Sequence, residues 1–141
     1  MSRLLLDTTF LIDDERSGVD VDDAIGDDGD VAIAAITVAE LLVGVELASG
    51  RRRSARRAYV DEIIESLPII EYDRDVAVEH ADLLVAVRAQ GRPRGAHDLL
   101  IAATARATDR TVVTADEEAF ANLPGVVTVS HRRDLRAQPE E

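Results

Sequence analysis

The sequence predicts an α/β domain built on a parallel β-sheet of four to five strands. Short apolar runs alternate along the chain with longer segments that have helical periodicity. Strands separated by such helices pair in parallel through right-handed crossover connections. The 141 residues, of which 46% are hydrophobic, show neither an internal repeat nor a linker, so residues 1–141 are expected to form one domain.

The predicted strands are the short apolar runs. The first is a run of leucines that ends at Asp7, and a later one is the sequence Thr-Val-Val-Thr before Asp116. The predicted strands cover residues 3–6, 31–35, 69–72, 110–114 and 126–129.

Helices in the first half are predicted from their ends and their periodicity. Residues 8–16 begin with threonines, which are suited to capping a helix. The next helix begins near Ile36 and ends near Gly50, since glycine often follows a last helical turn. Its core-facing residues are expected to be Leu41, Leu42 and Val45. Residues 52–66 form an amphipathic helix that ends before Pro68. Its apolar positions are Ala55, Tyr59, Ile63 and Leu67.

The second half continues the alternation. Residues 73–90 are predicted to be a helix, and the loop 91–96 leads to an apolar helix that opens at Asp98. The buried side of the first of these helices is expected to hold Val76, Ala77, Leu83, Leu84 and Val87. A helical turn is predicted at 117–122, and residues from about 131 to 141 form a polar tail. A short helix is also expected inside the acidic segment 13–30.

The composition excludes several classes of protein. With no cysteine, the chain can build neither a disulfide framework nor a thiolate zinc site. The apolar stretch before Asp7 is too short for a signal peptide, and no segment approaches the roughly 20 apolar residues that cross a bilayer. We therefore expect a cytoplasmic protein with no membrane partner.

The formal net charge of −12 argues only weakly against a phosphate-rich partner, because local fields steer ligands and the arginines are clustered. Most such clusters are solvated faces. All 16 basic residues are arginines, which a GC-rich coding bias or the acidic surface of a halophile explains as well as phosphate binding does. Arg52, Arg53 and Arg56 are nevertheless candidate contacts for RNA or a partner protein. The clusters contain Arg51, Arg52, Arg53, Arg56 and Arg57, then Arg88, Arg92 and Arg94, then Arg132, Arg133 and Arg136.

Four acidic residues stand where predicted strands end or near where predicted helices begin. We refer to them as the acidic quartet, which consists of Asp7, Glu40, Asp98 and Asp116. Carboxyl ends of parallel strands form the edge of the sheet at which ligands bind. Several carboxylates at one edge raise one another's pKa values, and a cation relieves that repulsion.

The quartet predicts a site for a hard divalent cation. Mg²⁺ prefers oxygen ligands and is typically held by one or two carboxylates, water and substrate phosphate. We hypothesise that Asp7 and Asp98 are the principal ligands of Mg²⁺ or Mn²⁺. Glu40 and Asp116 then complete the site directly, through water, or by positioning the nucleophile.

Each of these residues also has an ordinary structural interpretation. Asp7 and Asp98 are suited to capping the helices that follow them, and Asp116 to a turn or cap. Glu40 alone is typical of a solvated helix position. His97 invites a role as a general base, but we interpret it as structural.

Four sequence pieces resemble the PIN-domain nucleases and, within them, the VapC-type toxins of bacterial toxin–antitoxin pairs. They are LLDTT at 5–9, AELLVG at 39–44, HDLLIAA at 97–103, and VTAD at 113–116 with Phe120. Their order and spacing extend the resemblance over essentially the whole chain. The resemblance implies a three-layer α/β/α, PIN-like domain that acts as a homodimeric, Mg²⁺- or Mn²⁺-dependent endoribonuclease.

By the same resemblance the quartet is catalytic, and Thr8 and Thr114 support it by orienting water or phosphate. The expected products carry a 5′-phosphate and a 3′-hydroxyl. One position departs from the pattern, because many relatives have an acidic residue before the phenylalanine where this chain has Ala119. Asp116 must then serve alone, with Glu117 or Glu118 as an outer group.

The resemblance also implies partners. The substrate is RNA, whether tRNA, rRNA or mRNA, and a small VapB-type antitoxin is expected to place an arginine in the acidic pocket. The helices over 41–47 and 52–64 are the candidate dimer surfaces.

Three other classes of acidic α/β domain do not fit the sequence. A receiver domain requires a lysine, which the chain lacks, and a haloacid-dehalogenase-type phosphatase requires Asp-x-Asp where this chain has Asp7 and Thr9. A dinucleotide-binding fold requires a glycine-rich turn that Thr8 and Thr9 do not supply. The alternative that stays open is a catalytically weak, PIN-like module that binds nucleic acid or protein and regulates.

Overall fold

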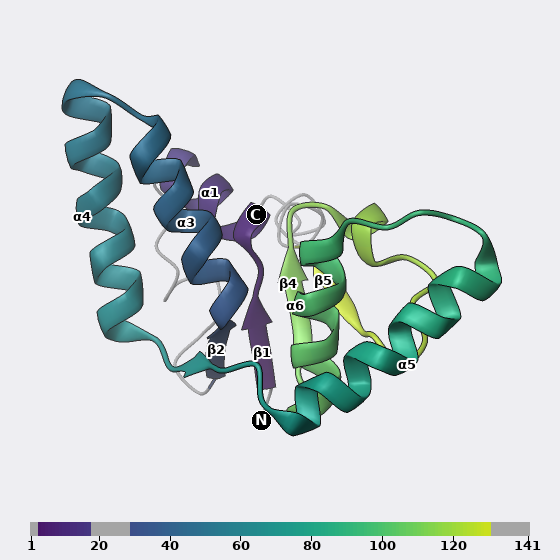
Figure 1. The fold of residues 1–141 in the computed structure, drawn as a ribbon. Coiled ribbons are helices and arrows are strands. Elements are labelled where there is room, and N and C mark those ends of the chain that lie inside the picture. Colours follow the sequence, from purple (N-terminus) through teal and green to yellow (C-terminus); the bar gives the residue numbers. More distant parts are fainter. Residues whose placement is uncertain (1–2, 18–28, 131–141) are drawn as a thin grey trace, which may run out of the picture.

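The protein folds around a five-stranded, fully parallel sheet, as seen in a computed structural model that describes residues 3–17 and 29–130 (Figure 1). The strands are β1 (Arg3–Leu6), β2 (Asp30–Ala34), β3 (Ile69–Ile70), β4 (Thr111–Thr114) and β5 (Thr128–Ser130). The helices are α1 (Thr8–Ser17), α3 (Ala35–Leu47), α4 (Gly50–Ser66), α5 (Arg74–Gln90), α6 (Ala96–Ala107) and the 3₁₀ helix η1 (Glu117–Phe120). The predicted fold class is confirmed. The short helix expected within the acidic segment and the polar tail lie outside the described residues.

The strand order is β3-β2-β1-β4-β5. The chain moves from β1 outward through β2 to β3, then returns to place β4 on the other side of β1. The order therefore reverses between β1 and β4, which makes their carboxyl ends the switch point at which open parallel sheets bind ligands. The first turn of α6 lies at this same end of the sheet (Figure 1).

Successive residues of the central strands face opposite layers of helices, as the two-residue period of a strand requires. Leu5 and Val112 pack in a core with residues of α5 and α6. Leu6 and Val113 pack in a second core with residues of α1, α3 and α4. Because both faces are covered, these strands are apolar on both sides, and the three-layer arrangement is confirmed.

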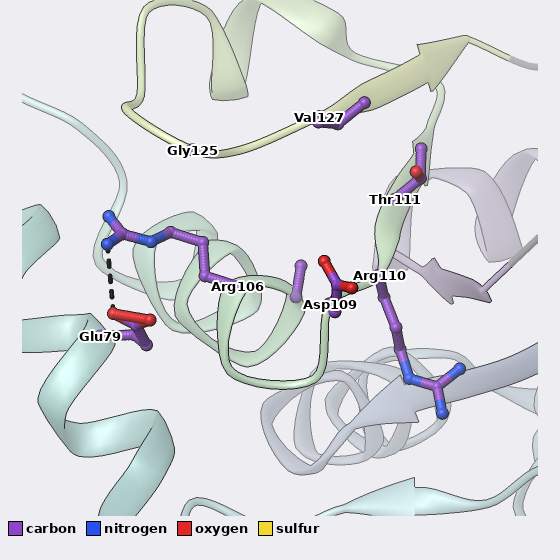
Figure 2. Close-up of a pocket in the computed structure, with 8 residues that line it drawn as sticks. Glu79, Arg106, Asp109, Arg110, Thr111, Gly125 and Val127 are labelled. Carbon is purple, nitrogen blue, oxygen red and sulfur yellow. Dashed lines mark hydrogen bonds and ion pairs between the residues drawn. The ribbon is translucent and has the colours of Figure 1, made fainter.

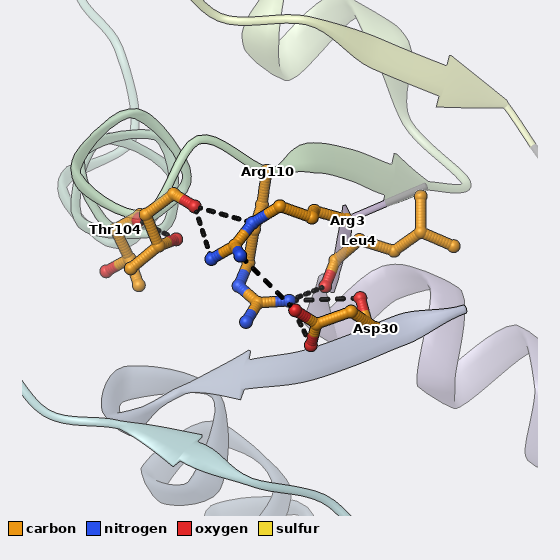
Figure 3. A network of polar contacts seen from close by, with 6 residues as sticks. Arg3, Leu4, Asp30, Thr104 and Arg110 are labelled. Atoms are coloured by element: carbon orange, nitrogen blue, oxygen red, sulfur yellow. Dashed lines mark hydrogen bonds and ion pairs between the residues drawn. The ribbon is translucent and has the colours of Figure 1, made fainter. Parts of the chain in front are cut away.

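An arginine network ties the amino ends of three strands together (Figure 3). Nη1 of Arg110 donates to the main-chain oxygens of Leu4 at 3.2 Å and Asp30 at 3.0 Å, and to Oδ1 of Asp30 at 3.0 Å. Its side chain is only 9% exposed. Arg3 approaches the same carboxylate at 3.5 Å. The network lies at the end of the sheet opposite the switch point.

Two predicted helix faces are partly wrong. In α4 Ala55 is exposed, and the buried residues are Val60 and Ile63. Residues spaced four apart drift around a helix that has 3.6 residues per turn, so Ala55, the first of the four predicted positions, does not face the core. In α5 Leu84 is 37% exposed because the buried stripe runs through Val76 and Leu83.

Several boundaries also differ from prediction. The apolar helix that was predicted to open at Asp98 is α6, which begins at Ala96, so Asp98 lies within its first turn. β3 ends at Ile70, since Asp73 already caps α5 by accepting from the amide of Val76 at 2.9 Å. β5 begins only at Thr128, because a turn around Gly125 occupies the preceding residues. Among the helices described, none is long and apolar enough to cross a membrane.

Candidate functional site

Asp7 follows β1 and is held at the switch point by three donors. The hydroxyl of Thr114, at the end of β4, lies 2.6 Å from its Oδ2. The Thr9 hydroxyl donates to the same carboxylate at 2.9 and 3.0 Å, and the Phe10 amide donates to Oδ1 at 2.8 Å. The bond from Phe10 shows that Asp7 also caps α1, so its structural and site interpretations are compatible.

Burial dominates the electrostatics of Asp7, whose residue surface is 2% exposed. Loss of hydration raises the pKa of its carboxyl group to about 6, although the bonds from Thr114, Phe10 and Thr9 oppose the rise. The charge of Asp98 raises it further. Asp7 therefore releases its proton close to neutral pH.

Glu40 reaches the site from α3. Its Oε1 accepts from the hydroxyl of Thr8 at 2.7 Å, and its Oε2 lies 3.3 Å from Nδ1 of His97. The side chain is 27% exposed. Glu40 is therefore a partly buried carboxylate fixed by two side chains, which differs from the solvated helix residue that its sequence position alone suggests.

Asp98 connects the quartet electrostatically. Burial raises the pKa of its carboxyl group, and the charges of Glu40 and then Asp116 raise it further, while His97 lowers it. Together with the effect of Asp98 on Asp7, these couplings place all four carboxylates in one neighbourhood. Asp98 does not cap α6, because the N-cap is Gly95 and no side-chain capping bond is made there. A carboxylate in the first turn is still favoured by the helix dipole.

Asp116 follows β4 and precedes η1. Its amide donates to the hydroxyl of Thr114 at 2.9 Å, which links it to the residue that also contacts Asp7. Its side chain makes no capping bond to η1. The cap interpretation therefore holds for Asp7 and is wrong for Asp98, while Asp116 occupies the N-cap position of η1 without a side-chain bond.

The donor set suits a hard cation, although the side chains do not converge on one point. All quartet ligands and the neighbouring threonine hydroxyls are oxygen donors, as Mg²⁺ and Mn²⁺ prefer. Within residues 3–17 and 29–130, no group of three or more His, Cys, Asp or Glu side chains is arranged to hold one ion. Asp7 and Glu40 instead point to local hydrogen-bond partners.

Beside Asp98 and Asp116 the surface forms a hollow of about 370 Å³. We call it the arginine hollow; its lining residues are Arg92, Pro93, Arg94, Gly95, Asp98, Asp116, Glu118 and Ala119. Ala119, which stands where many relatives have an acidic residue, is part of the wall of this hollow. Sequence reasoning missed Thr9 and Arg94 as contributors, although the two consecutive threonines after Asp7 were a usable signal.

A second hollow, of about 180 Å³, lies near the amino end of β4 (Figure 2). Its arginines serve the fold: Arg106 pairs with Glu79 at 3.1 Å, and Arg110 belongs to the strand network. No predicted site residue lines this hollow.

Comparison with known proteins assigns the chain to a family. A sequence model described as the PIN domain matches residues 4–126. The chain belongs to the PIN-domain family. Ribonuclease VapC5 of Mycobacterium tuberculosis is 35% identical to this PIN-domain protein over 125 residues, which are 89% of this chain and 90% of that protein.

Solved structures agree with the fold. The crystal structure of VapBC-5, a member of the VapBC family of toxin–antitoxin systems from M. tuberculosis, aligns with a TM-score of 0.75 at 28% identity, covering 92% of this chain and 99% of that one. VapBC2 from Rickettsia felis, bound to a DNA fragment from its promoter, aligns with a TM-score of 0.81 at 23% identity and covers 91% and 98% of the two chains. At that identity the second alignment shows the fold alone.

Proposed function

We propose that this PIN-domain protein is an endoribonuclease toxin that hydrolyses RNA phosphodiester bonds and is neutralised by a small VapB-type antitoxin. The observation that carries the proposal is the gathering of the acidic quartet at the β1–β4 switch point, where the charge of Asp98 raises the pKa of Asp7 and the charges of Glu40 and Asp116 raise that of Asp98. The relative named Ribonuclease VapC5 and the VapBC toxin–antitoxin structure support the same reading.

Mg²⁺ or Mn²⁺ is the cation that we propose for this site, with Asp7 and Asp98 as its principal protein ligands. When bound, such an ion lowers the pKa of water and offsets the charge that builds on the phosphodiester. Thr9 and Thr114 hold the Asp7 carboxylate in its ionised form by donating to both of its oxygens.

Glu40 and Asp116 are proposed to complete the site directly, through water, or by positioning the nucleophile. Thr8 and His97 fix the Glu40 carboxylate, which is then able to orient the attacking water by accepting its hydrogen bond. Asp116 lines the arginine hollow, where the RNA strand is proposed to enter.

The antitoxin is proposed to close the same site. A guanidinium group pairs bidentately with carboxylates, so an arginine from the antitoxin is a suitable inhibitor. We also propose a homodimer that uses α3 and α4, since Val43 is 55% and Leu47 is 83% exposed on α3. Light scattering of the isolated protein tests the dimer.

The central experiment is cleavage of total cellular RNA by purified, antitoxin-free protein with Mg²⁺ or Mn²⁺, followed by sequencing of the fragment ends. Asp98→Asn is expected to lower cleavage at least about 100-fold, and a chelator is expected to abolish it. Asp75→Asn is the matched control, because Asp75 occupies the first turn of α5 as Asp98 does that of α6.

Discrete cuts that require metal and Asp98 support the nuclease. Cleavage that survives in Asp98→Asn contradicts the assignment of the site. A folded protein that binds RNA without cutting it in either metal favours the regulatory binding module.

A further inference from the structure

We propose that Arg92 binds a phosphodiester group of the RNA strand next to the scissile one, in the arginine hollow. The proposal rests on the proposed function and adds a substrate-positioning residue that acts on phosphate and not on a base. It is carried by the contacts and charges of the loop between α5 and α6.

This loop forms one wall of the hollow, and it is fastened by Arg94. The guanidinium of Arg94 donates to the main-chain oxygen of Glu118 at 2.9 Å, to that of Ala119 at 3.4 Å, and to that of Ala121. These bonds tie the loop to η1, the segment that follows Asp116. The guanidinium of Arg94 is therefore occupied by main-chain oxygens of the protein.

Arg92 lies two residues earlier and lines the same hollow, and it is exposed. It makes no hydrogen bond or ion pair with any residue of the described ranges. Within the part of the chain that the structure describes, Arg92 is thus the one of the two lining arginines whose guanidinium remains available to a ligand.

The acidic residues around Arg92 make a cation necessary wherever a phosphate strand approaches the quartet. Asp98, Asp116 and Glu118 line the hollow and repel a polyanion. A strand that places its scissile phosphate beside Asp98 therefore needs a compensating cation next to it. Arginine suits this position because its planar guanidinium binds phosphate oxygens bidentately. Phosphate contacts of this kind fix the register of a nucleic acid without reading its sequence.

The test is the binding of a fluorescein-labelled, single-stranded RNA oligonucleotide, measured by anisotropy over a series of salt concentrations. All proteins carry Asp98→Asn so that the RNA stays intact. Arg92→Gln is compared with Arg74→Gln, which removes the same charge from an exposed arginine at the far end of α5.

Arg92→Gln is expected to weaken binding about tenfold and to reduce the salt slope by about 0.7 to 1, whereas Arg74→Gln leaves both near the parent values. Arg92→Lys is expected to keep the salt slope and to lose part of the affinity, since it retains the charge without the planar fork. In the otherwise native enzyme, Arg92→Gln is expected to raise KM more than it lowers kcat.

Equal affinities and salt slopes for Arg92→Gln and Arg74→Gln would overturn the proposal. So would a change confined to antitoxin binding, which would make Arg92 a partner contact. A failure of the proposed function is recognised separately, because cleavage that is independent of Asp98 contradicts the nuclease site, while the anisotropy experiment tests Arg92 alone.

Discussion

The hydroxyl of Thr114 lies 2.6 Å from Oδ2 of Asp7 and joins the carboxyl ends of β4 and β1. The donor stabilises the ionised form of a buried carboxylate whose pKa is raised to about 6. Residues from opposite ends of the chain, 107 positions apart, therefore set the protonation state of one group.

Replacement of Thr114 by valine is expected to raise the pKa of Asp7 further, because it removes a bond that lowers it. The fraction of ionised Asp7 at neutral pH falls, so cleavage is expected to decrease about 10- to 100-fold. The acidic limb of the pH–rate profile is expected to move to higher pH. Carbon-13 NMR of the Asp7 carboxyl group measures the titration directly. Thr104→Val is the control, because Thr104 is buried and donates to a main-chain oxygen of α6. An unchanged titration midpoint in Thr114→Val contradicts the prediction.

Asp7→Asn is expected to abolish cleavage and yet to stabilise the metal-free protein. The folded pKa of about 6 lies above the ordinary value of 3.8, so the folded state holds the proton more tightly than the unfolded state. The stabilisation that protonated Asp7 provides is present below about pH 4 and is lost as pH rises through 6. Denaturant unfolding in a chelator is expected to show a gain of about 1–3 kcal/mol at pH 7.5 that disappears at pH 4. A gain that persists unchanged at pH 4 is inconsistent with this account.

Gly95→Ala is expected to impair the site without unfolding the protein. A Cβ atom at this position lies 2.7 Å from Oδ2 of Asp98, so the carboxylate must rotate away. The φ of −61° suits alanine, so little backbone strain arises. We expect Mg²⁺ affinity, measured by calorimetry, to fall about tenfold while the melting temperature changes little.

Gly44→Ala is the matched control for that substitution. A Cβ there meets only the Arg56 side chain, at an ordinary 3.7 Å. Within α3 the change is expected to stabilise the protein by about 0.5–1 kcal/mol and to leave Mg²⁺ affinity unaltered. Equal Mg²⁺ affinities for the two variants would show that the orientation of Asp98 does not depend on Gly95.

Arg110→Met is expected to destabilise the fold while leaving cleavage intact at temperatures where the protein stays folded. It removes a 9% exposed guanidinium and leaves the oxygens of Leu4 and Asp30 without this donor. We expect a loss of about 2–4 kcal/mol in urea unfolding. Arg3→Met is expected to cost about 1 kcal/mol or less, because Arg3 is 48% exposed. Similar losses for both variants would refute the distinction between the buried and the exposed arginine.

Periodicity and local chemistry were sufficient to predict most elements. The apolar runs at 3–6 and 111–114 are strands, and the helix predicted over 73–90 is found as α5 from Arg74 to Gln90. The buried face of α4 was predicted less well. Residues spaced four apart move steadily around a helix, so this spacing alone does not show which of them face the core. Ala55 is exposed for this reason, while Val60 is buried.

The sequence by itself determined the parallel sheet, the two-sided apolar strands and the acidic residues at strand ends and early helix turns, because these depend on short-range periodicity and residue chemistry. Only the tertiary structure decided which side chains meet. The bond from Thr114 to Asp7, the fastening of the loop by Arg94, and the availability of Arg92 depend on contacts between segments far apart in the chain. Such contacts arise from the packing of helices and strands into layers, and no local pattern encodes them.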